Sequence, residues 1–136
     1  MSISTRINHI ALVVDDPDAA LRFWRDGLGL ALERTEVVPE QAAEVSFLPL
    51  GESHVELVRP TTTDSGLAKY LAKRGPGMHH VCVEVDDVAA MLERLKAGGF
   101  RLIDESPRVR ANGTRYAFIH PEAASGVLVE LYESAR

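Results

Sequence analysis

The stretch GMHHVCVEVDD, residues 77–87, is nearly a second copy of RINHIALVVDD, residues 6–16. Each copy is a short run of apolar and β-branched residues, typical of a buried strand, and each ends in two aspartates. His9 and His80 take the same place in the two copies and are 71 positions apart (80 minus 9). Because self-similarity at a fixed spacing is the signature of a repeated structural module, the two stretches indicate a chain built from two copies of one unit.

The similarity continues along most of the chain. Phe47 corresponds to Phe118 at the same spacing of 71 (118 minus 47), whereas Glu56 in HVELV corresponds to Glu130 in LVELY at a spacing of 74 (130 minus 56). One connecting loop of the second copy is therefore expected to be three residues longer (74 minus 71). We interpret the chain as a tandem repeat of a module of about 60 to 70 residues.

Each module is expected to fold in the order βαβββ. Asp16 and Asp87 follow the first strands and are suited to cap a helix, and Pro17 fits the first turn of the first helix. Apolar residues at helical spacing follow in both copies, until glycines loosen the helix end. Three further strands are expected in each module, at residues 30–38, 44–49 and 53–59 and at residues 101–103, 114–120 and 127–132.

The length and composition fit one domain. A chain of 136 residues with 46% apolar residues can form one compact core and is too short for two large domains. A helix is expected between the modules, beginning after Ser65 and ending at the Gly-Pro-Gly of residues 75–77. We therefore expect a single domain over residues 1–136, with module one at 5–60, the linking helix within 61–77 and module two at 78–136.

The charge and cysteine content exclude several classes of function. With 15 Lys and Arg scattered among 20 Asp and Glu, the chain has no basic stripe of the kind that binds nucleic acid. No apolar run approaches the roughly 20 residues that span a bilayer, and the first residues lack the apolar region of a signal peptide. The one cysteine, Cys82, rules out an internal disulfide, so we expect a cytoplasmic protein.

The most chemically specific residues are those that the repeat duplicates. His9 and His80 lie on the first strand of each module, and Glu56 and Glu130 lie on the last. Two imidazoles and two carboxylates suit a divalent transition metal, whose charge the carboxylates would neutralise. The repeat aligns His80 and not His79 with His9, and strand alternation places these neighbours on opposite faces. We predict His9, Glu56, His80 and Glu130 as metal ligands.

A structural role is the alternative for each of these residues. A single histidine on a strand is more often a core or surface residue than a ligand, and Glu56 alone would suit a solvated strand face. The duplication favours the metal site, because chance would have to place His on His and Glu on Glu. Cys82 shares a face with His80 and aligns with Ala11, and both are small enough to leave room beside the ligands. No neighbouring base marks Cys82 as a nucleophile.

Paired modules with His, Glu, His and Glu in this order resemble the vicinal oxygen chelate superfamily, and nearly the whole chain is similar to the methylmalonyl-CoA epimerase family. The stretches that carry this resemblance are INHIALVVDD (7–16), PEQAAEVSFLPLG (39–51), VELVRP (55–60), SGLAKYLAKRGPGMHHVCVEVDD (65–87) and FIHPEAASGVLVELYE (118–133). The resemblance implies an α+β fold in which two tandem βαβββ modules form a cup-shaped, eight-stranded mixed sheet around one divalent ion. Co²⁺ is favoured, with Mn²⁺, Zn²⁺ or Ni²⁺ as alternatives. A cytoplasmic homodimer of propionate metabolism is also implied.

The resemblance further implies epimerisation of (R)- and (S)-methylmalonyl-CoA at C2, by proton transfer through a metal-stabilised enolate. Inversion requires a base on each face of C2, and the family positions of these bases correspond to Glu44 and Glu130. Glu44 aligns with Arg115 (115 minus 44 is 71), so the modules differ where the chemistry is asymmetric. The alternatives are an exposed strand residue at Glu44, or a slip of the alignment to Glu40 or Gln41.

Two groups of basic residues are candidates for substrate contacts. The segment RVRANGTRYAF departs from the Gly-rich approach and small polar turn typical of the family, and its arginines would either contact a carboxylate or phosphate or form a basic surface. A second group on the linking helix would attract the phosphates of CoA, although a solvated helix face is the simpler explanation. These residues are Arg108, Arg110 and Arg115 in the segment and Lys69, Lys73 and Arg74 on the helix.

Other functions fit the same fold. A glyoxalase-I-like lyase would use the same four-ligand pattern, but the run at residues 65–87 favours the epimerase. A metal-free binding protein for a small molecule would not need the four ligands. An extradiol dioxygenase would use two histidines and one glutamate with iron, whereas Glu56 supplies a fourth candidate. The expected partner is therefore a small acyl-CoA substrate, with no nucleic acid and no membrane.

Overall fold

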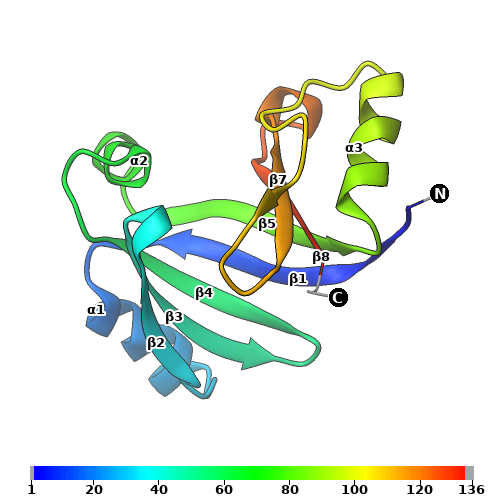
Figure 1. Ribbon diagram of the computed structural model, residues 1–136. Helices are drawn as coiled ribbons and strands as arrows, with labels where there is room; N and C mark the ends of the chain where they lie inside the picture. Colours follow the sequence, from blue (N-terminus) through cyan, green and yellow to red (C-terminus); the bar gives the residue numbers. More distant parts are fainter. Residues whose placement is uncertain (1, 134–136) are drawn as a thin grey trace. The chain divides into compact units, whose positions relative to one another are not determined.

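The computed structural model describes residues 2–133 (Figure 1). These residues form two compact units. The unit that we call the first consists of residues 9–79, and the second unit combines residues 2–8 with residues 80–133. Strands β1 and β5 contribute to both units, because the boundaries at His9 and His80 fall inside them.

Each unit has a mixed sheet. In the first unit the strands are hydrogen-bonded in the order β2 (Arg34–Val38), β3 (Ala43–Leu50), β4 (Ser53–Pro60) and β1 (Ser4–Val13). β1 and β4 are parallel, and the other pairs are antiparallel. In the second unit the start of β1 is followed by β5 (Gly77–Val85), β8 (Val129–Glu133), β7 (Arg115–Ile119) and β6 (Arg108–Val109), with β5 and β8 parallel. The strands of the described residues therefore confirm the predicted tandem βαβββ order.

Helix α1 (Pro17–Leu21) begins where the sequence predicts. The Asp16 carboxylate accepts hydrogen bonds from the N–H groups of Asp18 and Ala19, at 3.1 and 3.2 Å. The chain continues as a π-helical turn, Arg22–Gly27, which the sequence pattern did not predict. Leu21 packs into a buried cluster with apolar residues of β3 and β4, namely Leu48, Val55 and Leu57.

Helix α3 (Val88–Ala97) is the equivalent helix of the second unit and is regular throughout. Asp87 caps it as predicted, with its carboxylate 3.1 Å from the N–H of Ala90. Val88, Met91 and Leu92 are buried, and the helix packs against β7 and β8 (Figure 1). These apolar side chains recur at helical spacing, so one face of the helix covers the sheet of this unit.

Helix α2 (Gly66–Arg74) is the helix predicted between the modules. The Ser65 hydroxyl accepts a hydrogen bond from the N–H of Ala68 at 3.0 Å and so caps the first turn. The helix ends at Gly75, whose φ of 75° lies in the left-handed region that glycine adopts without a steric cost. Leu67 packs against a second buried cluster of the first unit, formed by Ala11, Ala43, Val45 and Val58.

The third element of the first module is shorter than predicted. The sequence suggested a strand over residues 30–38, but β2 includes only Arg34–Val38. The N–H of Leu30 donates to the carbonyl of Trp24 at 3.1 Å and closes the end of the preceding helical turn. Leu30 and Leu32 then pack into the core cluster around Leu21, so their apolar character serves packing under α1 and not strand pairing.

The strand predicted at residues 101–103 was wrong in position. These residues make one isolated bridge, between Leu102 and Ile119, and the edge strand β6 lies at Arg108–Val109. The Asp104 carboxylate accepts the N–H of Phe118 at 2.9 Å, and the Asp104 N–H donates to the Phe118 carbonyl at 3.1 Å. A side chain therefore takes the hydrogen bond that a continuing strand backbone would have made.

Within residues 2–133, no helix is both long enough and apolar enough to cross a bilayer. The extent of the domain over residues 1–136 and the module boundaries at 5–60, 61–77 and 78–136 stay predictions, and residues 1 and 134–136 lie outside the described range.

Candidate functional site

The first unit brings two of the predicted ligands into contact. His9 is on β1 and Glu56 is on β4, and the parallel register of these strands places Ala11 beside Glu56. His9 Nδ1 lies 3.1 Å from Glu56 Oε2, and the His9 side chain is almost fully buried. Ala11 is completely buried and contributes only a methyl group, which leaves space on this face for the larger His9 and Glu56 side chains.

A second imidazole joins this pair, and the sequence reasoning missed it. His54 Nε2 lies 2.8 Å from the same Glu56 oxygen, and the His54 ring stacks on the His9 ring with centroids 5.0 Å apart. His54 is the register partner of His9 and lies two residues before Glu56, so all three side chains share one face of the sheet. That two-residue spacing in HVE was the available signal.

The second unit holds the equivalent pair. His80 is on β5 and Glu130 is on β8, and their strands place Cys82 beside Glu130 just as Ala11 lies beside Glu56. His80 Nε2 lies 3.1 Å from Glu130 Oε1. Both side chains are buried, and Glu130 is only 1% exposed. An ionised carboxylate at this depth requires a compensating partner.

Arg110 is the cation that compensates Glu130. Its Nη2 lies 3.0 Å from Glu130 Oε2, and its guanidinium carbon lies 4.3 Å from the centre of the Tyr116 ring. Arg110 Nε is buried without a hydrogen-bond partner among the described residues. Of the three arginines that the sequence singled out in this segment, Arg110 contacts a buried carboxylate, Arg108 lies over Tyr116, and Arg115 is exposed with Glu133 at 3.9 Å.

His79 and Cys82, which lie close to His80 on β5, pack against other parts of the protein. The His79 ring packs edge-on against Tyr70, with centroids 4.8 Å apart, and is half-buried. Tyr70 in turn donates its hydroxyl hydrogen to the carbonyl of Met78 at 2.9 Å. Cys82 is completely buried. A buried thiol of this kind behaves as a small apolar residue, which agrees with its equivalence to Ala11.

Glu44, the predicted second base, lies on the other face of the first unit's sheet. The pairing of β3 with β4 places Phe47 opposite Glu56 and Glu44 opposite Arg59. Since successive residues of a strand alternate between faces, Val45 and Phe47 share the face of Glu56, and Glu44 does not. The structure therefore does not bring Glu44 together with His9 and Glu56.

Glu44 has an ordinary structural partner instead. Arg59 Nη2 lies 3.4 Å from a Glu44 carboxylate oxygen, and both side chains are partly exposed. The nearby alternatives, Glu40 and Gln41, lie in a short 3₁₀ turn between β2 and β3, where Glu40 is exposed. The counterpart of Glu44 in the second unit, Arg115, is also exposed. The two modules do differ at this position, but on a face without the predicted ligands.

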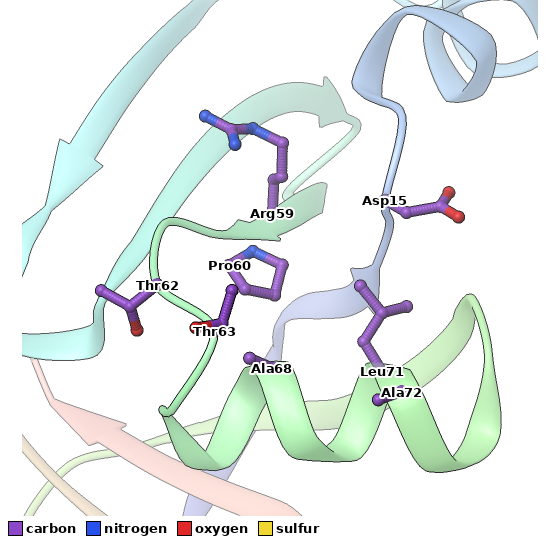
Figure 2. Close-up of a pocket in the computed structure, with 8 residues that line it drawn as sticks. All are labelled: Asp15, Arg59, Pro60, Thr62, Thr63, Ala68, Leu71 and Ala72. Atoms are coloured by element: carbon purple, nitrogen blue, oxygen red, sulfur yellow. The ribbon is translucent and has the colours of Figure 1, made fainter.

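A pocket of about 330 Å³ lies in the first unit where β4 leads into α2. Figure 2 shows Ala68 and Leu71 on the side of α2 that faces Pro60, while the Arg59 guanidinium points away from the helix. The lining residues do not include His9, His54 or Glu56. The basic residues Lys69, Lys73 and Arg74 on α2 are exposed, and Arg74 lies over the Tyr70 ring at 5.1 Å.

Comparison with known proteins gives a consistent result. Residues 8–118 match the model of the Glyoxalase/Bleomycin resistance protein/Dioxygenase superfamily. Over 130 residues the chain is 38% identical to the mitochondrial methylmalonyl-CoA epimerase of Mus musculus, covering 95% of this chain and 73% of the relative. The ethylmalonyl-CoA/methylmalonyl-CoA epimerase of Cereibacter sphaeroides is 36% identical over 128 residues, covering 93% and 96%.

A solved structure agrees in fold as well as in sequence. A variant of Streptomyces coelicolor methylmalonyl-CoA epimerase in complex with 2-nitronate-propionyl-CoA superposes with a TM-score of 0.88 at 37% identity, covering 98% of this chain and 96% of that one. This likeness confirms the predicted fold class, two tandem βαβββ modules of the vicinal oxygen chelate type.

Proposed function

The chain belongs to the methylmalonyl-CoA epimerase family of the Glyoxalase/Bleomycin resistance protein/Dioxygenase superfamily, and we propose that it interconverts (R)- and (S)-methylmalonyl-CoA. One observation carries the proposal within this family: each unit holds a histidine and a glutamate in contact at equivalent strand positions. A metal-free binding protein would have no use for two such pairs.

We propose that one divalent ion is held by His9, Glu56, His80 and Glu130, and that it is Co²⁺. The donor chemistry fits, because imidazole nitrogen and carboxylate oxygen suit Co²⁺, Mn²⁺, Zn²⁺ and Ni²⁺. In each unit the two donor atoms are 3.1 Å apart, close to the spacing of about 3 Å expected for neighbouring ligands of one ion. A bound divalent ion would supply Lewis-acid stabilisation of the negative charge that develops on the thioester oxygen.

Glu130 is our candidate for the base that moves the C2 proton. Arg110 holds Glu130 Oε2, which fixes the rotation of the carboxylate and leaves Oε1 beside His80. The nearly complete burial of Glu130 keeps bulk water away from this oxygen, and a general base must be held within hydrogen-bond reach of the proton that it moves. Glu44 stays a prediction for the second base, and its place on the opposite face of the sheet argues against that role.

The acyl-CoA substrate, a homodimeric assembly and a cytoplasmic location complete the proposal. The first is supported by relatives named as methylmalonyl-CoA epimerases and by the acyl-CoA analogue bound in the Streptomyces coelicolor structure. The homodimer follows from the family resemblance, and the location follows from the single cysteine of the chain.

Isotope exchange tests the proposal directly. Incubation of one epimer of methylmalonyl-CoA with metal-loaded protein in D₂O is expected to place deuterium at C2 and to produce the other epimer, as measured by mass spectrometry and chiral analysis. Ethylmalonyl-CoA provides a second substrate, since one relative is named for both. Exchange should be lost after chelation and return with Co²⁺. A folded, metal-loaded protein without exchange, but active on a glutathione hemithioacetal, would instead indicate the lyase.

A further inference from the structure

We infer that the first unit by itself presents a three-donor site for a divalent cation, made of His9, His54 and Glu56. The inference rests on the proposed metal dependence and adds His54 to the ligand set. Glu56 Oε2 lies 3.1 Å from His9 Nδ1 and 2.8 Å from His54 Nε2. The three donor atoms all lie within 4.8 Å of one another.

These distances fit coordination of one ion. Ligand atoms about 2.1 Å from an ion are about 3 Å apart when they meet it at a right angle, and somewhat farther apart in a tetrahedron. Both nitrogen–oxygen distances are near this value. Two imidazoles and one carboxylate on one side of an ion also form a recognised donor set for divalent transition metals.

The fold holds His54 in place from two sides. On one side its ring stacks on His9, at an interplanar angle of 29°, and on the other side it packs against Phe47 at 5.7 Å between centroids. The Arg34 guanidinium covers Phe47 at 3.9 Å from the ring centre. A side chain that neighbours restrict in this way presents its donor atom with little loss of conformational freedom.

The positions of the three residues on their strands also support a common site. His9 and His54 are register partners on the parallel strands β1 and β4, and Glu56 follows His54 on the same face. The His54 side chain is 24% exposed, so an ion can reach it from solvent without unfolding of the strand. The cation expected here is one that accepts mixed nitrogen and oxygen ligands, such as Zn²⁺, Co²⁺ or Ni²⁺.

Zinc titration of protein labelled with ¹⁵N-histidine tests the inference. Long-range ¹H–¹⁵N spectra report each imidazole separately, and coordination changes the shift of the ligating nitrogen. We expect His54 and His9 to respond together at one equivalent of Zn²⁺. His79, which packs on Tyr70, and His120, whose Nδ1 accepts the N–H of Glu122, serve as internal references that should not respond.

Three variants sharpen the test. His54→Gln should raise the Zn²⁺ dissociation constant by more than roughly 100-fold, beyond the roughly 10- to 100-fold that the loss of an outer partner of a ligand costs. His120→Gln is the matched control and should leave it unchanged. In His80→Gln, which removes a ligand of the second unit, the His54 and His9 nitrogens should still respond to Zn²⁺ at a higher concentration.

The possible failures are distinguishable. If no histidine of the wild-type protein responds to Zn²⁺ or Co²⁺, the proposed metal dependence itself fails. If His9 and His80 respond and the His54 nitrogen does not, the metal site stands and His54 is only a hydrogen-bond partner of Glu56, which overturns the inference. A loss of the His54 response in His80→Gln would also overturn it, because the first unit would then be insufficient.

Discussion

The two units contain the same His–Glu pair, but each adds a different third side chain to it. In the first unit the addition is a second imidazole, His54, and the Glu56 side chain keeps 14% of its surface exposed. In the second unit the addition is a guanidinium, Arg110, and the Glu130 side chain is only 2% exposed. The first unit therefore has an additional potential metal donor, whereas the second has a cation that permits deep burial of a carboxylate. The two modules thus share the His–Glu pair and differ in the side chain that contacts its glutamate.

The largest difference in exchange rate is expected between variants of Glu130 and Glu44, the two glutamates predicted as bases. Glu130→Gln should lower the rate of C2 deuterium exchange by about 10²- to 10⁴-fold, the usual contribution of a general base. Glu44→Gln should change it by less than about threefold, well below the contribution of a base, because Glu44 pairs with Arg59 on the opposite face. Metal content is measured in both variants. A loss of exchange in Glu44→Gln with metal retained would restore Glu44 as the second base.

Removal of the side chain that each unit adds to its His–Glu pair should affect stability differently in the two units. Arg110→Met leaves the buried Glu130 without its cation and is expected to lower the free energy of unfolding by about 3 kcal/mol. His54→Gln, beside the partly exposed Glu56, should lower it by less than about 1 kcal/mol. Urea denaturation at neutral pH measures both.

The charge explanation can be checked with a second substitution. Glu130→Gln introduced into Arg110→Met removes the unpaired charge and should recover most of the lost stability. If the double variant is no more stable than Arg110→Met, the loss arises from the packing of Arg110 on Tyr116 and not from the buried carboxylate.

Much of the fold could be predicted because the repeat fixed the register of the elements. The capping residues Asp16, Ser65 and Asp87 all lie where the sequence placed them, since each cap depends on local hydrogen bonds. The position of the edge strand β6 at Arg108–Val109, in place of the strand predicted at residues 101–103, could not be predicted. The pairing expected of residues 101–103 is replaced by the Asp104 side chain, a contact that depends on the distant residue Phe118 and leaves no periodic pattern in the sequence.

The site likewise has residues that the sequence could identify and residues that it could not. The duplication identified His9, Glu56, His80 and Glu130, because equivalent strand positions recur; the structure adds that His9 contacts Glu56 and that His80 contacts Glu130. The duplication could not identify His54, which has no histidine counterpart in the second module. Glu44 came from the family resemblance and stays a prediction; its face could not be read from the sequence, since β3 has apolar residues on both faces.

The helix caps offer a smaller contrast. Asp87→Ala should destabilise the second unit by about 1 kcal/mol, because it removes the acceptor at the start of a regular helix in which Val88 and Met91 are buried. Asp16→Ala should cost about half as much, since α1 passes after five residues into a π-helical turn. Thermal unfolding of the two variants measures the difference. An equal loss in both would mean that the π-helical turn is as tightly coupled to the fold as α3.

The smallest effect is expected at the aspartate that precedes each cap, and it depends on pH. A hydrogen bond from the Ser2 hydroxyl at 2.6 Å, and then one from the Ile3 N–H at 2.9 Å, lower the pKa of Asp86 below its ordinary value. Because the folded pKa is the lower one, the resulting stabilisation is present above the unfolded pKa of about 3.9 and is lost as the pH falls through the folded pKa.

Asp86→Asn should therefore lower stability at pH 7 and make it less dependent on pH between about pH 5 and pH 2, as measured by urea denaturation across that range. Asp15, the equivalent residue of the first unit, is exposed at the pocket of Figure 2, so Asp15→Asn is the matched control for the loss of one negative charge. If both substitutions flatten the pH profile equally, the effect belongs to the net charge of the chain and not to the Ser2 hydrogen bond, and the two units would be alike at this position.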